Sequence, residues 1–188
     1  MELKDAIDQR RSYRSLDPVV ITDDIVRELA EAAALAPSCY NNQPWRYVFV
    51  FDEKVLDELK SSLSRGNEWA EYASLIIAVC SKPELDCQIK DGREYYSFGV
   101  GMSVGIMMLK ATELGLVCHG IAGYSPSKAK EVLQVPDDME VITLLIAGKH
   151  SDEIKPYLSE KQVEAEKERP PRLGLSEFAF RDIYGEEI

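Results

Sequence analysis

The sequence has few cysteines. Only four occur in 188 residues, and Cys39, Cys80, Cys87 and Cys118 show none of the paired spacings that bind a metal. Four cysteines are also too few for a disulfide framework in a chain of this length. The sequence therefore predicts a reduced, cytoplasmic protein that has no cysteine-bound metal.

Long hydrophobic runs and an excess of positive charge are absent as well. No apolar stretch approaches the roughly 20 residues that cross a bilayer, and the charged N-terminus Met-Glu-Leu-Lys-Asp has no apolar signal region. Lys and Arg number 22 against 33 Asp and Glu, which gives a net charge of -11. Nucleic acid requires a broad basic face. We therefore expect neither a membrane nor a nucleic acid as a partner.

The chain does have the size and composition of one globular domain. A length of 188 residues is enough to bury a sizeable core. The hydrophobic fraction of 45% and the charged fraction of 29% are ordinary for a globular protein. Internal repeats and low-complexity segments are lacking. A single domain spanning residues 1–188 is predicted.

Apolar residues recur with helical spacing in several segments, and shorter apolar runs have the length of strands. Helices are predicted over residues 2–9, 23–35, 54–63, 95–114 and 126–133, and strands over residues 46–51, 75–80 and 141–147. With a further strand after Gly115, about four central strands alternate with a larger number of helices. This order predicts an α+β fold with helices on both faces of the sheet.

The predicted helix at residues 95–114 is apolar on nearly all sides. Gly99, Gly101 and Gly105 allow another backbone to approach closely, although each weakens the helix by roughly 1 kcal/mol. A helix that lacks a polar face is expected in a core or in a dimer interface.

Three arginines and a serine lie within five residues near the N-terminus, as Arg10, Arg11, Ser12 and Arg14. Arginine offers a planar fork of donors that bonds phosphate oxygens and keeps its charge, and serine adds a hydroxyl donor. This cluster in an acidic chain is typical of a phosphate site. The alternative is a solvated helix end with surface salt bridges.

A polar stretch between Pro37 and Pro44 reads as a loop, since two prolines bracket it. Asn41 and Gln43 offer planar donors and acceptors suited to the edge of a heterocycle. Trp45, at the start of the following strand, is expected to anchor the core.

The two motifs together, R-R-S-x-R and then P-S-x-x-N-x-Q-P-W, resemble the FMN-dependent nitroreductase family. The resemblance extends through Glu113-Leu114-Gly115 to Glu177. It implies a three-layer α/β/α fold with a mainly antiparallel central sheet, in a domain-swapped homodimer. It also implies hydride transfer from NADH or NADPH through bound FMN to a nitroaromatic, quinone or similar small acceptor.

The resemblance also assigns cofactor contacts. Each FMN site would take Arg10, Arg11, Ser12 and Arg14 from one subunit, and Pro37, Ser38, Cys39 and Asn41 from the other. The backbone of the strand after Gly115 would face the flavin ring, and a late arginine would bind the phosphate, with Arg172 preferred to Arg169. The full set is Arg10, Arg11, Ser12, Arg14, Pro37, Ser38, Cys39, Asn41, Gln43, Asn67, Cys118, His119, Gly120, Arg169 and Arg172.

Some assignments stay open at the level of sequence. Asn67 fits either a flavin contact or a helix N-cap, and His119 fits either a general acid or a satisfied structural residue. Cys118 and Cys39 fit either a tuning role or small buried residues. The apolar tail at residues 173–188 is expected to pack on the partner subunit.

The chain departs from the family pattern where it would build the substrate pocket. Gly99 stands where an acidic residue is expected, and Gly105-Ile106 stand where Gln or Glu followed by Asn is expected. Two alternatives follow: an FMN enzyme with another reaction, such as metabolite dehydrogenation or flavin breakdown, or a non-catalytic flavin-binding protein. No Gly-x-Gly-x-x-Gly fingerprint is present to choose between NADH and NADPH.

Overall fold

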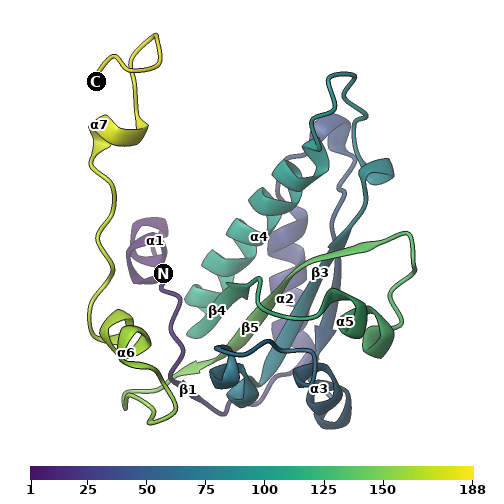
Figure 1. Ribbon diagram of the computed structural model, residues 1–188, viewed down its shortest axis with the longest axis vertical. Coiled ribbons are helices and arrows are strands. Elements are labelled where there is room, and N and C mark those ends of the chain that lie inside the picture. Colours follow the sequence, from purple (N-terminus) through teal and green to yellow (C-terminus); the bar gives the residue numbers. More distant parts are fainter.

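The computed structural model describes residues 1–188 as an α+β fold (Figure 1). The helices are α1 (Leu3–Gln9), α2 (Asp23–Ala34), α3 (Glu53–Lys60), α4 (Tyr95–Glu113), α5 (Pro126–Leu133), α6 (Glu160–Lys167) and α7 (Leu175–Phe178). The strands are β1 (Leu16–Asp17), β2 (Arg46–Val50), β3 (Leu75–Ser81), β4 (Leu116–Ile121) and β5 (Glu140–His150). No helix combines the length and the apolar character needed to cross a bilayer.

The sheet has five strands, and every pairing in it is antiparallel. The long strand β5 lies at its centre. Ala147 of β5 pairs with Leu75 of β3 and with Cys118 of β4, so β3 and β4 lie on opposite sides of β5. β1 pairs with the far end of β5, and β2 forms the outer edge beside β3. The predicted mainly antiparallel sheet is confirmed, with the two-residue strand β1 in addition.

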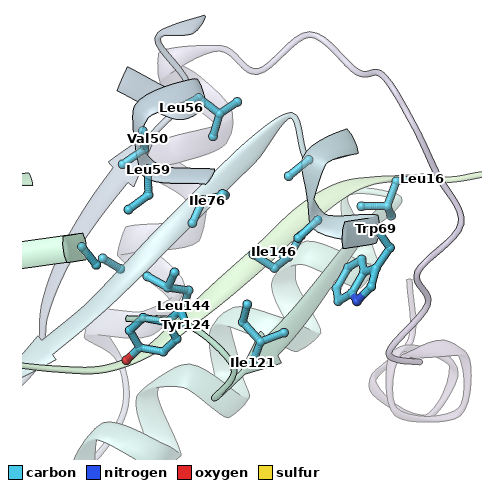
Figure 2. Close-up of a cluster of buried hydrophobic side chains, with 14 of the residues drawn as sticks. Leu16, Val50, Leu56, Leu59, Trp69, Ile76, Ile121, Tyr124, Leu144 and Ile146 are labelled. Atoms are coloured by element: carbon cyan, nitrogen blue, oxygen red, sulfur yellow. The ribbon is translucent and has the colours of Figure 1, made fainter. Parts of the chain in front are cut away.

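Helices cover both faces of this sheet, which separates two hydrophobic clusters. Successive residues of β3 alternate between them, as the two-residue repeat of a strand requires: Ile76 packs on the α3 and α5 side, and Ile77 packs on the α2 and α4 side. Figure 2 shows the first cluster, where Leu56 and Leu59 of α3 lie over the sheet. All of β3 is buried, which confirms the prediction of a central strand covered on both faces.

Helix α4 is buried along one face and half-buried at most of its other apolar positions. Val100, Ser103, Met107 and Ala111 are buried, and the Ser103 hydroxyl donates to the carbonyl of Ala33 in α2 at 2.8 Å. On the outer side, Phe98 keeps 56% of its surface exposed. The surface of α4 around Phe98 therefore has no partner in a single chain.

The C-terminal part runs away from the sheet (Figure 1). Helix α6 was missed from sequence because residues 151–172 are highly charged and show little apolar periodicity. It starts at a capping box made by Ser159 and Gln162. Beyond α6 the chain is extended past Pro170–Pro171 and leaves large apolar side chains exposed, namely Leu173, Leu175, Phe178, Ile183, Tyr184 and Ile188.

Candidate functional site

The basic cluster near the N-terminus forms one wall of a pocket. The cavity has a volume of about 240 Å³ and is lined by Arg10, Arg11, Ser12, Arg14, Ala165, Arg169, Pro170 and Arg172. Two segments some 150 residues apart thus bring five arginines together. None of these five forms a salt bridge with a carboxylate, so surface ion pairs do not account for the cluster.

The charges in this pocket repel one another. The pKa of Arg10 is lowered, first by burial and then by the nearby guanidinium groups of Arg169 and Arg172. Burial also lowers the pKa of Arg14, and the Glu166 carboxylate opposes that effect. Like charges that converge without a salt-bridge partner are stabilised by a bound anion. The pocket therefore has the chemistry of an anion site.

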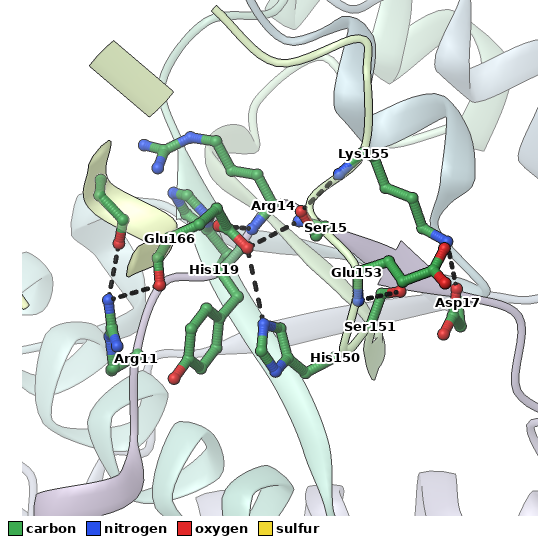
Figure 3. A network of polar contacts seen from close by, with 12 residues as sticks. Arg11, Arg14, Ser15, Asp17, His119, His150, Ser151, Glu153, Lys155 and Glu166 are labelled. Carbon is green, nitrogen blue, oxygen red and sulfur yellow. Dashed lines mark hydrogen bonds and ion pairs between the residues drawn. The ribbon is translucent and has the colours of Figure 1, made fainter. Parts of the chain in front are cut away.

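Glu166 on α6 fixes the arginine-bearing segment in place (Figure 3). Its buried carboxylate accepts hydrogen bonds from the backbone N–H of Arg14 at 2.7 Å and of Ser15 at 3.3 Å. His150 Nε2 lies 3.6 Å from the same carboxylate. The charge on the acceptor makes these bonds strong. No sequence motif marked Glu166, because its partners lie about 150 residues away.

Two of the arginines donate hydrogen bonds to backbone carbonyls. Arg11 donates to the carbonyls of Ala165 at 2.7 Å and Glu166 at 3.2 Å. Arg169 donates to the carbonyls of Asp8 and Arg10. These bonds tie α6 and the segment after it to residues 8–11. Arg172 bonds only the nearby carbonyl of Pro170 at 3.0 Å, and its guanidinium is freer to meet a ligand.

The segment that carries the N-terminal arginines reaches strand β4, where His119 bonds the Tyr13 carbonyl. β4 pairs only with β5 and leaves its other edge free. Alternate backbone groups of an edge strand point outward and are available to a ligand. Arg10 is close enough to interact electrostatically with Cys118. Gly120 is the exposed residue of this strand. Cys118 is buried, and burial raises the pKa of its thiol to about 12, which leaves it a small core residue.

His119 makes the contacts of a satisfied structural residue. Its ring is buried, stacks on Trp69 with centroids 4.6 Å apart, and donates from Nδ1 to the carbonyl of Tyr13 at 3.1 Å. Burial lowers the pKa of His119 to about 4. The imidazole is therefore neutral near pH 7, and the general-acid alternative loses its support.

Asn67 occupies the N-cap position of a short 3-10 helix at Glu68–Tyr72, but its side chain makes no capping hydrogen bond. Its amide instead donates to the carbonyl of Gly123 at 2.8 Å. Asn67 is therefore an N-cap by position only, because its side chain bonds a neighbouring strand end and not the helix backbone. A Cβ at Gly123 would lie only 2.2 Å from Asn67 Nδ2, so this contact requires glycine.

The loop with Ser38, Asn41 and Gln43 does not line the arginine pocket of the same chain. Ser38 Oγ accepts from the backbone N–H of Gln43 at 2.9 Å, which closes the loop after Pro37. Trp45 is buried, as predicted for a core anchor.

Cys39 forms a disulfide with Cys87, and the expectation of a fully reduced chain is wrong. The two cysteines are 48 residues apart, and their spacing gave no sign that the fold brings them together. Cys80 and Cys118 are free and buried, as expected of small core residues.

Asp86 was not identified from the sequence, although it lies beside this loop. Its carboxylate is close to Gly99 of α4: a Cβ at Gly99 would lie 3.8 Å from Asp86 Oδ2 and 3.4 Å from Pro44 Cγ. The absence of a side chain at Gly99, where an acidic residue was expected, leaves room for a carboxylate from another segment.

Known proteins resemble this chain in sequence and fold. Residues 7–149 match the model of the nitroreductase family. An Archaeoglobus fulgidus protein named as an NADH dehydrogenase/NAD(P)H nitroreductase is 27% identical over 148 residues, which cover 77% of this chain and 83% of the relative. A Thermus thermophilus protein named NADH dehydrogenase is 25% identical over 183 residues, covering 81% and 89%. The crystal structure of an oxidoreductase containing FMN superposes with a TM-score of 0.84 at 26% identity, covering 97% of this chain and 92% of that one. The chain belongs to the nitroreductase family.

Proposed function

We propose that this protein binds FMN and passes hydride from NADH or NADPH to a small oxidised acceptor such as a nitroaromatic or a quinone. The observation that carries the proposal is the pocket of five arginines and Ser12, which contains no carboxylate. Family membership and the FMN-containing structural relative support the same conclusion.

The residues present fit the phosphate of FMN. A phosphate monoester carries up to two negative charges and several acceptor oxygens, which match the guanidinium forks of Arg10, Arg14 and Arg172 and the Ser12 hydroxyl. Arg11 and Arg169 hold the pocket walls together through backbone carbonyls. The mutual repulsion around Arg10 is relieved when an anion binds.

The neighbouring residues suit a flavin ring. FMN supplies the hydride chemistry when bound, and the protein supplies orientation and electrostatics. The free edge of β4 offers backbone donors that do not titrate. Arg10 or Arg14 is the candidate to stabilise the negative charge that reduction leaves near N1 and O2 of the ring. His119 stays neutral and holds the strand against Tyr13.

The proposal includes a homodimer with a site built from both subunits. Within one chain, the loop around Ser38 and Asn41 is absent from the arginine pocket. Two apolar surfaces lack a partner: the outer face of α4 at Phe98, and the tail at residues 173–188. Exposed apolar surface of this extent is typical of protein–protein contacts. A second copy would cover both surfaces and bring the loop to the site.

A comparison of FMN with riboflavin tests the proposal, since riboflavin lacks only the phosphate. Two charge-assisted hydrogen bonds at about 1.5 kcal/mol each predict roughly 100-fold tighter binding of FMN. Titrations followed by flavin fluorescence measure both affinities. Arg172→Ala should weaken FMN binding and leave riboflavin binding unchanged. Equal affinity of the wild-type protein for the two flavins would contradict a phosphate role for the pocket.

A further inference from the structure

The Cys39–Cys87 disulfide joins two surface segments with little regular structure. Cys39 lies in the loop at residues 38–43, and Cys87 lies between β3 and α4. Both cysteines are half-buried, whereas Cys80 and Cys118 are fully buried. Cys87 also lines an open cavity of about 180 Å³ with Pro83 and Tyr96. A small thiol can therefore reach this disulfide, which is the single disulfide of the chain.

The loop at residues 38–43 is held in an unfavourable backbone conformation. Tyr40, Asn41 and Gln43 have φ values of 46°, 58° and 50°, in the left-handed region that favours glycine. The Tyr40 side chain is 92% exposed and packs on nothing that would offset this strain. Strained residues persist only where their surroundings hold them. Here the loop is attached to Asp86 and Cys87 through the disulfide and through the Asn42 amide, which donates to Asp86 Oδ1 at 3.2 Å and to Cys87 Sγ at 3.6 Å.

Asp86 gives the reduced form an interaction that the disulfide form lacks. A carboxylate oxygen of Asp86 lies within 4.8 Å of both sulfur atoms. Asp86 Oδ2 is buried and accepts no hydrogen bond, while Oδ1 accepts from Asn42. A disulfide offers no donor, whereas reduction creates two S–H groups near the Asp86 carboxylate, one of whose oxygens has no partner. Reduction would therefore supply donors to a buried carboxylate and release a strained loop.

We propose that Cys39 and Cys87 form a reversible dithiol–disulfide couple that sets the conformation of the loop at residues 38–43. A thiolate of a dithiol reductant attacks one Sγ atom, forming a mixed disulfide and releasing the other cysteine as a thiolate that takes up a proton. The second thiol of the reductant displaces the remaining cysteine. The protein gains two electrons and two protons, and the reductant becomes a cyclic disulfide.

The functional consequence rests on the proposed function, because the loop carries Ser38, Asn41 and Gln43, which are expected to contact FMN. The disulfide form holds this loop in one conformation and binds FMN more tightly. The reduced form must order the loop on binding, which lowers affinity. We expect about tenfold weaker FMN binding after reduction.

The test equilibrates the purified protein with mixtures of reduced and oxidised dithiothreitol, then alkylates free thiols with iodoacetamide for mass spectrometry. Cys39 and Cys87 should gain the label together as the reduced fraction rises. Asp86→Asn removes the charged acceptor that favours the reduced form. The equilibrium constant for reduction of the disulfide by dithiothreitol should therefore be about fivefold smaller in this variant. A disulfide that survives excess dithiothreitol would overturn the proposal, as would thiols that never pair or an unchanged equilibrium in Asp86→Asn.

Hydrogen exchange of the backbone at residues 38–43 gives a readout that needs no flavin. Exchange should be at least tenfold faster in the reduced protein, and Cys87→Ser should exchange rapidly with or without dithiothreitol. Equal exchange in both forms would overturn the role in loop conformation. If the loop responds and the protein binds no FMN, the proposed function fails and the redox couple stands. If FMN binds equally to both forms, the effect on cofactor affinity is refuted.

Discussion

Glu166→Gln tests how the arginine segment is held. The side chain of Glu166 is only 2% exposed, and its two oxygens accept from Arg14 N–H and Ser15 N–H. A Gln amide can accept from one of these groups, but its NH₂ then faces the other donor. One charge-assisted bond is lost and one buried N–H is left unpaired.

The loss of that bond predicts destabilisation by about 2–3 kcal/mol. In a chain of this size each kcal/mol lowers the melting temperature by about 2–4 °C. Urea unfolding and thermal melts measure the change. Because the backbone at Arg14 and Ser15 loses its anchor, FMN affinity should also fall about tenfold.

Glu164→Gln is the matched control on the same helix. Its side chain is 73% exposed and makes only an i,i+3 pair with Lys167, which is worth a few tenths of a kcal/mol. The control should unfold and bind FMN almost as the wild type does. If Glu166→Gln behaves like this control, the buried carboxylate does not position the arginines and the reasoning is refuted.

Three further predictions concern protonation, phosphate binding and assembly. Since the folded pKa of His119 is about 4 against 6.5 for the free side chain, the unfolded state binds its proton first as pH falls. The free energy of unfolding should drop by up to about 3 kcal/mol between pH 6.5 and pH 4. Urea unfolding of His119→Phe should not show this drop, and the same pH dependence in the variant and the wild type would contradict the prediction. Arg172→Ala should lower FMN affinity with little effect on the free energy of unfolding. Arg169→Ala should also destabilise the protein, because Arg169 bonds the carbonyls of Asp8 and Arg10. If Arg172→Ala destabilised the protein more than Arg169→Ala does, these roles would be disproved. Phe98→Asp should shift the mass measured by light scattering from dimer to monomer, and a dimer of unchanged affinity would place the interface elsewhere.

Local patterns predicted most of the secondary structure. The predicted helix at residues 23–35 is α2, which begins where Thr22 accepts from Ile25 N–H. The predicted strand at residues 75–80 is β3, whose residues alternate between two cores. Strand β1 escaped prediction because it is two residues long and exists only through its pairing with β5. Helix α6 was not predicted because it has no apolar stripe, and its start is defined by a capping box.

The candidate site was predictable in part. The three arginines within residues 10–14 predicted an anion-binding site, because so many positive charges lie close together. The structure brings Arg169 and Arg172 to the same pocket. Glu166, Asp86 and the pairing of Cys39 with Cys87 depend on contacts between distant segments, and no local spacing records such contacts. For Asn67 the sequence left a flavin contact and a helix N-cap open, and its bond to the Gly123 carbonyl depends on a contact between distant segments.

The visible spectrum of the purified protein, recorded without air before and after separate additions of NADH and NADPH, tests the central claim most directly. The account predicts a yellow protein, loaded with FMN as purified or after FMN is added, whose absorbance near 450 nm is bleached by at least one of the two nucleotides and restored by a quinone. A yellow protein that neither nucleotide bleaches would retain the flavin site and refute the proposed hydride donor. A protein that stays colourless after FMN is added and the excess removed would contradict the account.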